Sequence, residues 1–247
     1  MKKYAKKYFD RVRQILDDVE KTQAGVIDRV GKKMADVIVA GGNVFVFGCA
    51  HAGIMAEEMF YRAGGLALIN PLFNPTLVCD VKPITLTSVM ERQPGLGIGI
   101  VDGSPLKKGD LLIVHSVSGR NSVPVEVADR AKSKGVYVVA LTNLDYSSKL
   151  TSRHPSGKKL YQVADIVIDN CGDFEDAAVA IDGMKQKSGA TSTVIGASIL
   201  HAISLTAIEY LQQQGETPPI YHSANVDGGD EFNNKLMEKF SERIFYL

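Results

Sequence analysis

The chain has 247 residues, of which 45% are hydrophobic and 23% charged, a composition typical of a globular protein with a substantial core. Its 28 basic residues balance its 28 acidic residues, so no strong field indicates nucleic acid as a partner. No apolar run approaches the roughly 18 residues of a membrane span, and the basic N-terminus is not followed by the apolar segment of a secretion signal. The three cysteines are far apart and lack zinc-binding spacing, so we predict a cytoplasmic protein without a metal site.

Residues 1–42 predict a helical extension, because apolar side chains recur there at every third or fourth position. Gly25 or Gly31 could divide this pattern into two helices, and Gly41–Gly42 ends it. We interpret the apolar stripe as a core face. A subunit interface is the alternative for part of it.

From residue 43 onward, short apolar runs alternate with helical patterns. The expected strands are residues 44–47, 66–69, 111–114, 136–141 and 166–168. The expected helices are residues 54–63, 80–92, 123–133 and 191–213, with a short amphipathic helix at the C-terminal end. Residues 95–99 are interpreted as a loop. Because the strands are apolar throughout, the sequence predicts an α/β fold, a three-layer αβα sandwich with a central parallel sheet. Residues 43–247 are expected to be one structural unit.

Small and polar residues follow two of the expected strands. The strand that begins at Leu111 ends in Ser116-Val117-Ser118-Gly119-Arg120-Asn121, and the first strand ends in Gly48-Cys49-Ala50-His51-Ala52-Gly53. In open α/β sheets, ligands bind beyond the carboxyl ends of the strands, where the N-terminus of the next helix favours an anion. One such loop could equally be a turn in which Ser118 or Asn121 caps a helix. Two of them favour an anion-binding crevice, with Ser122 as a further donor.

These loops and the order of the elements resemble the sugar isomerase (SIS) domain family, whose members bind phosphorylated sugars. The first loop of that family has the form Gly-x-Gly-x-Ser, and the second the form Ser-x-Ser-Gly, which Ser116–Gly119 matches. The match extends to Ala140-Leu141-Thr142-Asn143. Three further stretches resemble a bacterial branch of SIS-domain phosphosugar-binding proteins that is similar to phosphoheptose isomerase: residues 152–158, 189–194 and 223–230.

The resemblance covers nearly the whole chain and implies the flavodoxin-like SIS fold with a sugar phosphate as ligand. The residues that it implies for binding the phosphate or the sugar are Gly48, Ser116, Ser118, Gly119, Asn121, Ser122 and Thr142. Because SIS domains usually complete their sites across an interface, a homodimer or homotetramer is expected.

The first loop departs from the family pattern at two positions. Ala50 replaces the glycine and Ala52 replaces the serine. A hydrogen bond to a charged group contributes roughly 1.5–3 kcal/mol, so loss of that hydroxyl is expected to weaken binding by about one or two orders of magnitude. Phosphate binding by the second loop is expected to persist. Catalysis is the less certain of the two activities.

Four side chains are candidates for acid–base chemistry. Glu57 and Glu58 lie on the helix that the first loop opens, and one of them is expected to face the crevice as a general base. The alternative for each is a solvated position. His51 in the first loop is a candidate for acid–base chemistry, with packing in the turn as the alternative. His201 resembles in placement the helix histidine of some SIS isomerases, although a core histidine is the interpretation that we favour for it.

Two polar segments could close over a ligand, including one held by a neighbouring subunit. They contribute His154, Ser156, His222 and Asn225. His115 at the end of its strand is expected to be buried.

The first hypothesis for function is aldose–ketose isomerisation of a sugar phosphate through an enediolate. The alternatives are a protein that senses a phosphosugar without converting it, which Ala50 and Ala52 favour, and a lyase or etherase of an amino-sugar phosphate. Residues 95–99 lack the spacing of a dinucleotide fingerprint, and the chain has neither an ATP-binding P-loop nor a serine-hydrolase elbow. No cofactor is therefore predicted.

Overall fold

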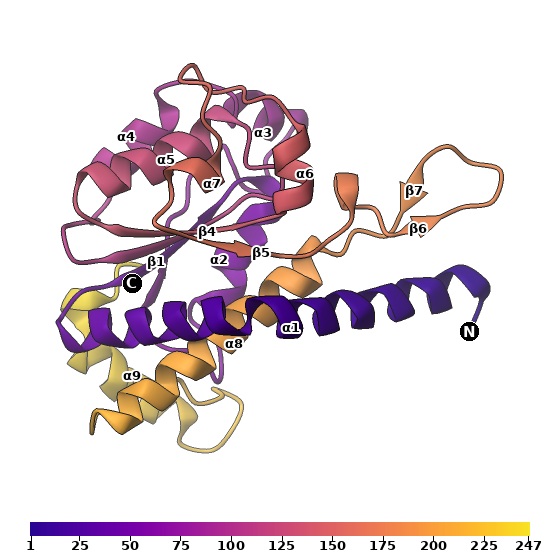
Figure 1. Cartoon of the computed structure of the whole chain (residues 1–247). Coiled ribbons are helices and arrows are strands. Elements are labelled where there is room, and N and C mark those ends of the chain that lie inside the picture. Colours follow the sequence, from indigo (N-terminus) through magenta and orange to yellow (C-terminus); the bar gives the residue numbers. More distant parts are fainter.

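The computed structural model describes all 247 residues, and its centre is a parallel sheet of five strands in the order β2-β1-β3-β4-β5 (Figure 1). The strands are β1 (Val44–Gly48), β2 (Ile69–Pro71), β3 (Leu111–His115), β4 (Tyr137–Thr142) and β5 (Ile166–Asp169). After β1 the chain pairs β2 on one side and then crosses to place β3 on the other. This change of direction makes the edge between β1 and β3 the switch point of the sheet.

Helices cover both faces of the sheet, so each strand sends alternate side chains into two apolar layers. One layer contains Val44 and Val46 of β1, and the other contains Phe45 and Phe47. The helices over the first layer are α1 (Lys3–Val39), α2 (Ile54–Met59) and α8 (Ser192–Gln213). Those over the second are α4 (Leu96–Asp102), α5 (Ser122–Ser133) and α7 (Leu160–Val163). The predicted α/β fold with a central parallel sheet is confirmed.

The remaining elements connect these layers or extend from them. They are the helices α3 (Thr85–Met90), α6 (Leu144–Lys149) and α9 (Gly229–Lys239), the 3-10 turns η1 (Ala50–Gly53), η2 (Phe174–Asp176) and η3 (Ser241–Arg243), and the hairpin of β6 (Val179–Ala180) and β7 (Lys187–Ser188). The N-terminal half of α1 projects beyond the sheet beside this hairpin (Figure 1). Lys3 Nζ lies 2.6 Å from Asp182 Oδ2, and Tyr8 Oη donates to Ala190 O at 2.8 Å.

The helix α1 runs unbroken from Lys3 to Val39, so the predicted division at Gly25 or Gly31 is wrong. The two glycines have different surroundings. A Cβ on Gly25 would meet no atom within 4 Å, whereas a Cβ on Gly31 would lie 2.6 Å from Thr206 Cβ and 3.1 Å from Ile203 O on α8. Gly31 therefore lets α1 and α8 approach each other closely, and the helix continues through it because that packing outweighs the poor helix propensity of glycine.

This contrast predicts opposite effects of two identical substitutions. Gly25→Ala should raise the free energy of unfolding by about 0.5–1 kcal/mol, because alanine restricts the unfolded chain and strengthens the helix. Gly31→Ala should lower it by about 1–3 kcal/mol, because the added methyl group overpacks the contact with α8. Guanidinium unfolding curves of both variants measure this. Equal stability of the two variants would contradict the close packing of α1 on α8.

Three expected elements have different bounds. Residues 95–99 are not a loop, because α4 begins at Leu96, and the carboxylate of Glu126 accepts hydrogen bonds from Gly95 N (2.7 Å) and Gly97 N (2.9 Å) at its start. The first expected helix after β1 ends at Met59, and the strand expected at residues 66–69 begins at Ile69. For α4, a contact distant in sequence, which local periodicity does not report, sets the start of the helix.

One helix, α8, is long and apolar enough to cross a bilayer by length and composition alone. In this fold it packs beside α1 and α2, and its side chains Ile195, Ile199 and Ile203 belong to the core. Burial within the molecule therefore accounts for part of the apolar character of α8.

Candidate functional site

The two predicted loops lie side by side at the switch point of the sheet. Gly48, at the end of β1, is the register partner of His115, at the end of β3. The Nδ1–H of His115 donates to Ala52 O at 3.1 Å, which links the first loop (residues 48–53) to the end of β3. A Cβ on Gly48 would lie 2.3 Å from Ala52 O and 2.8 Å from Gly53 N. The first loop therefore folds back so tightly on β1 that only glycine fits at this position.

The second loop (residues 116–121) has several backbone amides without an acceptor in the chain. Gly119 N donates to Ser116 Oγ at 3.2 Å, and Gly119 takes a left-handed conformation with φ of 56°. The N–H groups of Val117, Ser118, Arg120 and Asn121 make no hydrogen bond within the molecule. They precede α5, whose N-terminus adds the positive end of its dipole. This arrangement of amides is a cradle suited to an anion such as phosphate.

Three of the predicted binding residues hold the second loop in place. Thr142 is fully buried, and its hydroxyl donates to Ser116 O (2.7 Å) and Val117 O (3.0 Å). Ser122 is also buried and donates to Arg153 O at 3.3 Å. The amide of Asn121 joins the carboxylate of Glu91 to Arg153 Nη1, which lies 3.0 Å from Asn121 Oδ1. Ser118, by contrast, is half-buried and its hydroxyl has no partner in the chain.

The first loop keeps an unusual backbone despite its departures from the family pattern. Ala50 has a φ of 50°, the left-handed region in which glycine is favoured, and its N–H donates to Leu77 O at 2.6 Å. This conformation costs an alanine on the order of 1 kcal/mol, and such strain is often concentrated at functional sites. His51 is exposed beside it. Ala50 thus takes the left-handed conformation in which glycine is favoured, and the methyl group of Ala52 offers no hydrogen-bond donor.

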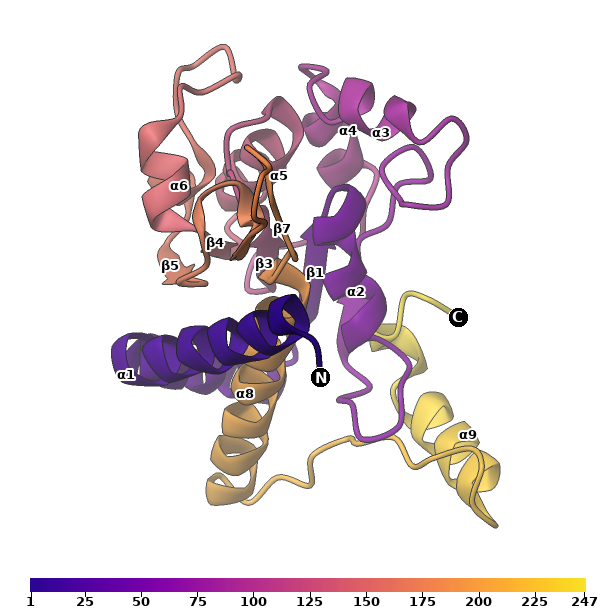
Figure 2. The same ribbon diagram turned by 90° about the vertical axis from the view of Figure 1, so that its right-hand side faces the viewer.

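The helix α2 directs its two glutamates to different sides. The side chain of Glu58 meets α8, where its Oε1 lies 2.8 Å from His201 Nε2 and accepts a hydrogen bond from Arg62 Nη1. Glu57 is exposed and lies near Cys79, whose pKa its charge helps to raise. Figure 2 shows α2 extending from the first loop beside α8. Glu58 is five residues beyond Gly53, about 7 Å along the helix axis.

The Glu58–His201 pair lies in a partly buried setting beside Arg62. Partial burial lowers the pKa of His201 below its ordinary value, and the positive charge of Arg62 lowers it further. The Nε2–H of the imidazole donates to the carboxylate of Glu58. Glu58 Oε2 makes no hydrogen bond in the chain and can accept a proton. Arg62 is not among the residues predicted from the sequence, although its i+4 spacing from Glu58 is a signal for this contact.

His115 is buried, as predicted, and its Nε2 has no hydrogen-bond partner. Burial lowers the pKa of His115, against smaller opposing effects of the hydrogen bond to Ala52 and the charge of Asp176. The unfolded chain therefore binds a proton below about pH 6.5 that the folded chain does not bind.

This difference predicts that His115 makes the protein less stable as the pH falls from about 6.5 toward the lower folded-state pKa, by up to about 1.4 kcal/mol per pH unit. The loss should be smaller in His115→Gln, which keeps a donor for Ala52 O. Urea unfolding at pH 7.5 and pH 5.5 measures it. His222→Gln, which alters an exposed ring, should keep the wild-type loss. An unchanged loss in His115→Gln would show that the loss has another source.

The predicted closing segments lie in different places. His154 is next to Arg153, whose backbone N–H donates to Arg120 O of the second loop at 2.7 Å. The Nδ1 of His154 lies 2.7 Å from Ser156 Oγ. His222 stacks on Phe232, with ring centroids 4.1 Å apart, and Asn225 is exposed.

The backbone before His222 fixes the position of the second segment. Tyr221 N donates to Gly65 O at 3.0 Å, and Ile220 forms a bridge with Leu66. Residues 64–66 follow α2 at its end away from the first loop. Within one molecule, His154 and Ser156 therefore lie near the second loop, whereas His222 and Asn225 lie apart from it.

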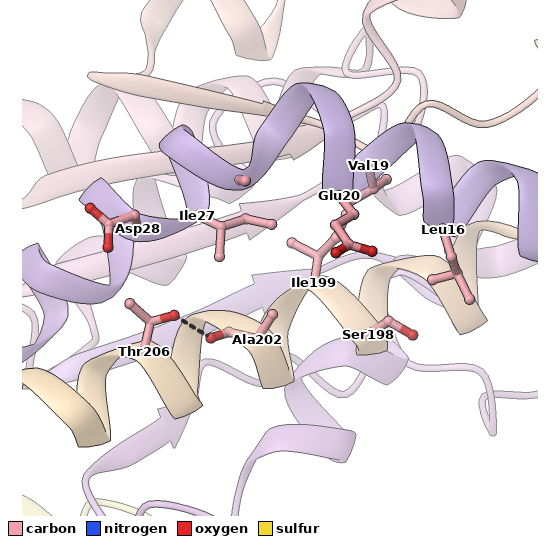
Figure 3. Close-up of a pocket in the computed structure, with 10 residues that line it drawn as sticks. Leu16, Val19, Glu20, Ile27, Asp28, Ser198, Ile199, Ala202 and Thr206 are labelled. Carbon is pink, nitrogen blue, oxygen red and sulfur yellow. Dashed lines mark hydrogen bonds between the residues drawn. The ribbon is translucent and has the colours of Figure 1, made fainter.

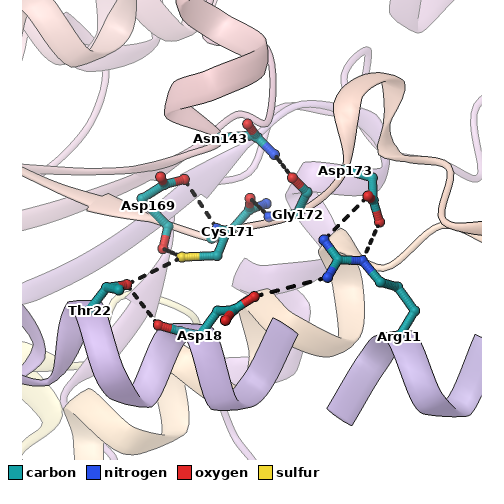
Figure 4. A network of polar contacts seen from close by, with 9 residues as sticks. Arg11, Asp18, Thr22, Asn143, Asp169, Cys171, Gly172 and Asp173 are labelled. Atoms are coloured by element: carbon teal, nitrogen blue, oxygen red, sulfur yellow. Dashed lines mark hydrogen bonds and ion pairs between the residues drawn. The ribbon is translucent and has the colours of Figure 1, made fainter. Parts of the chain in front are cut away.

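The segment after β5 is fixed between α1 and α8 (Figure 4). Arg11 of α1 forms an ion pair with Asp173 at 2.9 Å, and Asn143 Nδ2 donates to Gly172 O at 2.8 Å. Asp176 then accepts hydrogen bonds from Ser192 N (2.9 Å) and Ser192 Oγ (2.6 Å) at the start of α8. Burial is the main cause that raises the pKa of Cys171, so this thiol stays protonated. The segment after β5 therefore links α1 to the start of α8, the helix that carries His201.

A surface groove of about 470 Å³ runs between α1 and α8 (Figure 3). Apolar side chains form most of its wall, and Glu20 and Asp28 also line it. The apolar lining residues are Leu16, Val19, Ala24, Ile27, Ile199 and Ala202. The groove is separate from the two loops.

An open parallel sheet with two small-residue loops at its switch point defines an α/β protein with a ligand crevice. Residues 7–143 match the SIS domain family. Relatives include the UPF0309 protein OB3413 of Oceanobacillus iheyensis, 45% identical over 99% of each chain. The UPF0309 protein SCO4393 of Streptomyces coelicolor is 41% identical over 99% of this chain and 98% of the relative. The chain therefore belongs to the SIS domain family and, within it, to the UPF0309 group, which confirms the resemblance.

Two solved structures share the fold. A phosphoheptose isomerase from Francisella tularensis has a TM-score of 0.55 at 17% identity, covering 82% of this chain and 95% of that chain. A phosphoheptose isomerase from Neisseria gonorrhoeae has a TM-score of 0.52 at 17% identity, covering 83% of this chain and 95% of that chain.

Proposed function

We propose that the protein binds a sugar phosphate between the two loops and isomerises it between aldose and ketose through an enediolate. The observation that carries the proposal is the group of free amides around Ser118, at the N-terminus of α5. The phosphate would rest on these amides and on the hydroxyls of Ser116 and Ser118. Membership of the SIS family supports this choice of ligand, as does the fold shared with two phosphoheptose isomerases.

The chemistry would be carried by Glu58. Its Oε2 would remove the proton from C2 of the open-chain aldose, so that the C–H electron pair forms the C1=C2 bond of the enediolate and the π pair of the C1=O bond moves to O1. Transfer of the hydroxyl proton from O2 to O1 and return of the first proton to C1 then leave the carbonyl at C2, which gives the ketose. His201 would hold the carboxylate through its Nε2–H, and Arg62 would offset the negative charge on the enediolate oxygens. His51 is a candidate for assisting ring opening, since it is exposed in the first loop.

Binding and exchange experiments test the two parts of this proposal separately. Calorimetric titration with pentose, hexose and heptose phosphates should detect binding, and the unphosphorylated sugars should bind at least about tenfold more weakly, because they lack the charged group. In D₂O, a bound substrate should gain deuterium at the carbon that exchanges its proton. If none of the sugar phosphates binds, the proposed ligand class is wrong.

The second candidate is a sensor that binds a phosphosugar without converting it, and Ala52 favours it. The loop carbonyl of Ala52 is held by His115, but its side chain offers no donor to the ligand. Binding without deuterium exchange would support this candidate. A lyase or etherase would instead release part of an amino-sugar phosphate, which product analysis would detect.

We also propose that the protein is a homo-oligomer of the cytoplasm. The groove between α1 and α8 and the exposed apolar side chains Phe9 and Leu205 on the same helices support a subunit contact there. A dimer or tetramer mass in light scattering at micromolar concentration is expected, and a monomer mass would contradict the oligomer. The three cysteines form no disulfide, in keeping with a reducing compartment.

A further inference from the structure

Three arginines from separate parts of the chain gather at the N-terminus of α5. Arg120 belongs to the second loop, Arg92 follows α3, and Arg153 lies in the segment between α6 and α7. The backbone of Arg153 donates to Arg120 O at 2.7 Å, and its guanidinium is 3.0 Å from Asn121 Oδ1. The carbonyl of Glu91, the residue before Arg92, accepts a hydrogen bond from Val123 N at the start of α5 (3.1 Å). Desolvation lowers the pKa of Arg153, and the charges of Arg120 and Arg92 lower it further, against a smaller opposing effect of Glu91. These residues are called the arginine cluster below.

The cluster is not neutralised within the chain. None of its three guanidiniums forms an ion pair, whereas Arg11, Arg13, Arg62 and Arg130 each have a carboxylate within 4.0 Å. The carboxylate of Glu91 accepts a hydrogen bond from Asn121, and its charge acts on Arg92 and Arg153 without forming an ion pair with either. Arg120 donates to Thr151 Oγ1 at 3.2 Å through Nη2, but its buried Nε has no acceptor. Three guanidiniums beside a single carboxylate leave an excess of positive charge, and like charges held together are destabilising, so this arrangement favours an additional anion.

The phosphate cradle and the arginine cluster are neighbouring but distinct. The free amides and the Ser118 hydroxyl belong to the turn at Gly119, beside the first loop. The Arg120 side chain points instead to Thr151, and Arg153 approaches Asn121 from the segment after α6. Asn121 lies between the two regions. Guanidinium groups suit carboxylates and phosphates equally, because both present oxygens to their parallel N–H groups.

We propose that the arginine cluster binds a second anionic group of the ligand, so that the preferred substrate class is a sugar phosphate that carries a further carboxylate or phosphate. This inference rests on the proposed function, since the first phosphate occupies the amide cradle. The cluster selects the ligand and anchors it, while Glu58 carries out the proton transfer. Sugars with one phosphate bind the cradle alone.

Calorimetric titration with matched pairs of probes tests the inference. One pair is glucose 6-phosphate and 6-phosphogluconate, which differ by a carboxylate, and the other is fructose 6-phosphate and fructose 1,6-bisphosphate. The wild-type protein should bind the doubly anionic member of at least one pair about tenfold or more tightly, from charge-assisted hydrogen bonds. The pair that shows the preference identifies the second group as carboxylate or phosphate.

The variants Arg92→Gln and Arg153→Gln should reduce this preference to less than about threefold while the singly phosphorylated probe still binds. Both side chains are exposed, and the melting temperature of each variant is the check on folding. Arg130→Gln, which removes an arginine paired with Asp102 farther along α5, should keep the preference.

Three outcomes would overturn the inference. Equal binding of both members of each pair by the wild-type protein would do so while leaving sugar-phosphate binding intact. A preference that survives in Arg92→Gln and Arg153→Gln would place its source elsewhere. Binding of neither member would contradict the proposed function together with the inference.

Discussion

Replacing Glu58 with glutamine is expected to lower the rate of isomerisation by about 10²- to 10⁴-fold, the usual contribution of a general base. Glutamine keeps the size of the side chain and can still accept a hydrogen bond from His201 Nε2, but it cannot take the proton from C2. The affinity for the sugar phosphate should change less than about threefold, because the phosphate is held by the second loop. Deuterium exchange at C2 and calorimetric titration measure the two effects.

The neighbouring Glu57 provides the matched control. Its carboxylate lies on the side of α2 that faces Cys79, so Glu57→Gln should leave the exchange rate within about threefold of wild type. Rapid exchange in Glu58→Gln would exclude Glu58 as the base. Slow exchange in both variants, with normal binding, would show that the glutamates act on each other and not separately.

The parallel sheet could be predicted because burial on both faces requires strands that are apolar at every position, a pattern visible in the local sequence. Val44–Phe47 and Leu111–Val114 are apolar at every position, which is rare outside a parallel strand covered by helices. The start of α4 could not be predicted in the same way. It depends on Glu126, some thirty residues away, whose carboxylate binds the amides of Gly95 and Gly97. Such a partner appears only once the chain is folded.

The candidate site shows the same difference between residues that the local sequence places and residues that only the fold brings together. The serines and glycine of the second loop follow a strand directly, so their position at the sheet edge could be derived from the sequence. The roles of Thr142 and Ser122 as supports of that loop depend on hydrogen-bond partners, which composition does not reveal. The arginine cluster draws on segments about thirty residues apart, and no spacing rule joins Arg92 to Arg153. His201 meets Glu58 only because α8 packs beside α2.

Replacing Gly48 with alanine is expected to lower the free energy of unfolding by about 1–3 kcal/mol, the usual cost of overpacking. The added Cβ would meet Ala52 O at 2.3 Å and Gly53 N at 2.8 Å, both of them backbone atoms that cannot rotate away. The first loop must therefore move from β1, which breaks the hydrogen bond from His115 to Ala52 O. Guanidinium unfolding gives the stability, and calorimetric titration with a sugar phosphate gives the affinity, which should fall at least about tenfold.

Gly99→Ala tests whether this effect is specific to position 48. Gly99 lies within α4, where a Cβ would meet no atom within 4 Å, so the same chemical change should raise the free energy of unfolding by about 0.5–1 kcal/mol and leave the affinity unchanged. If Gly48→Ala matched Gly99→Ala in both measurements, the conclusion that the first loop packs tightly against β1 would be wrong. If it lost stability but kept its affinity, the phosphate would depend on the second loop alone, and the first loop would only support the end of β1.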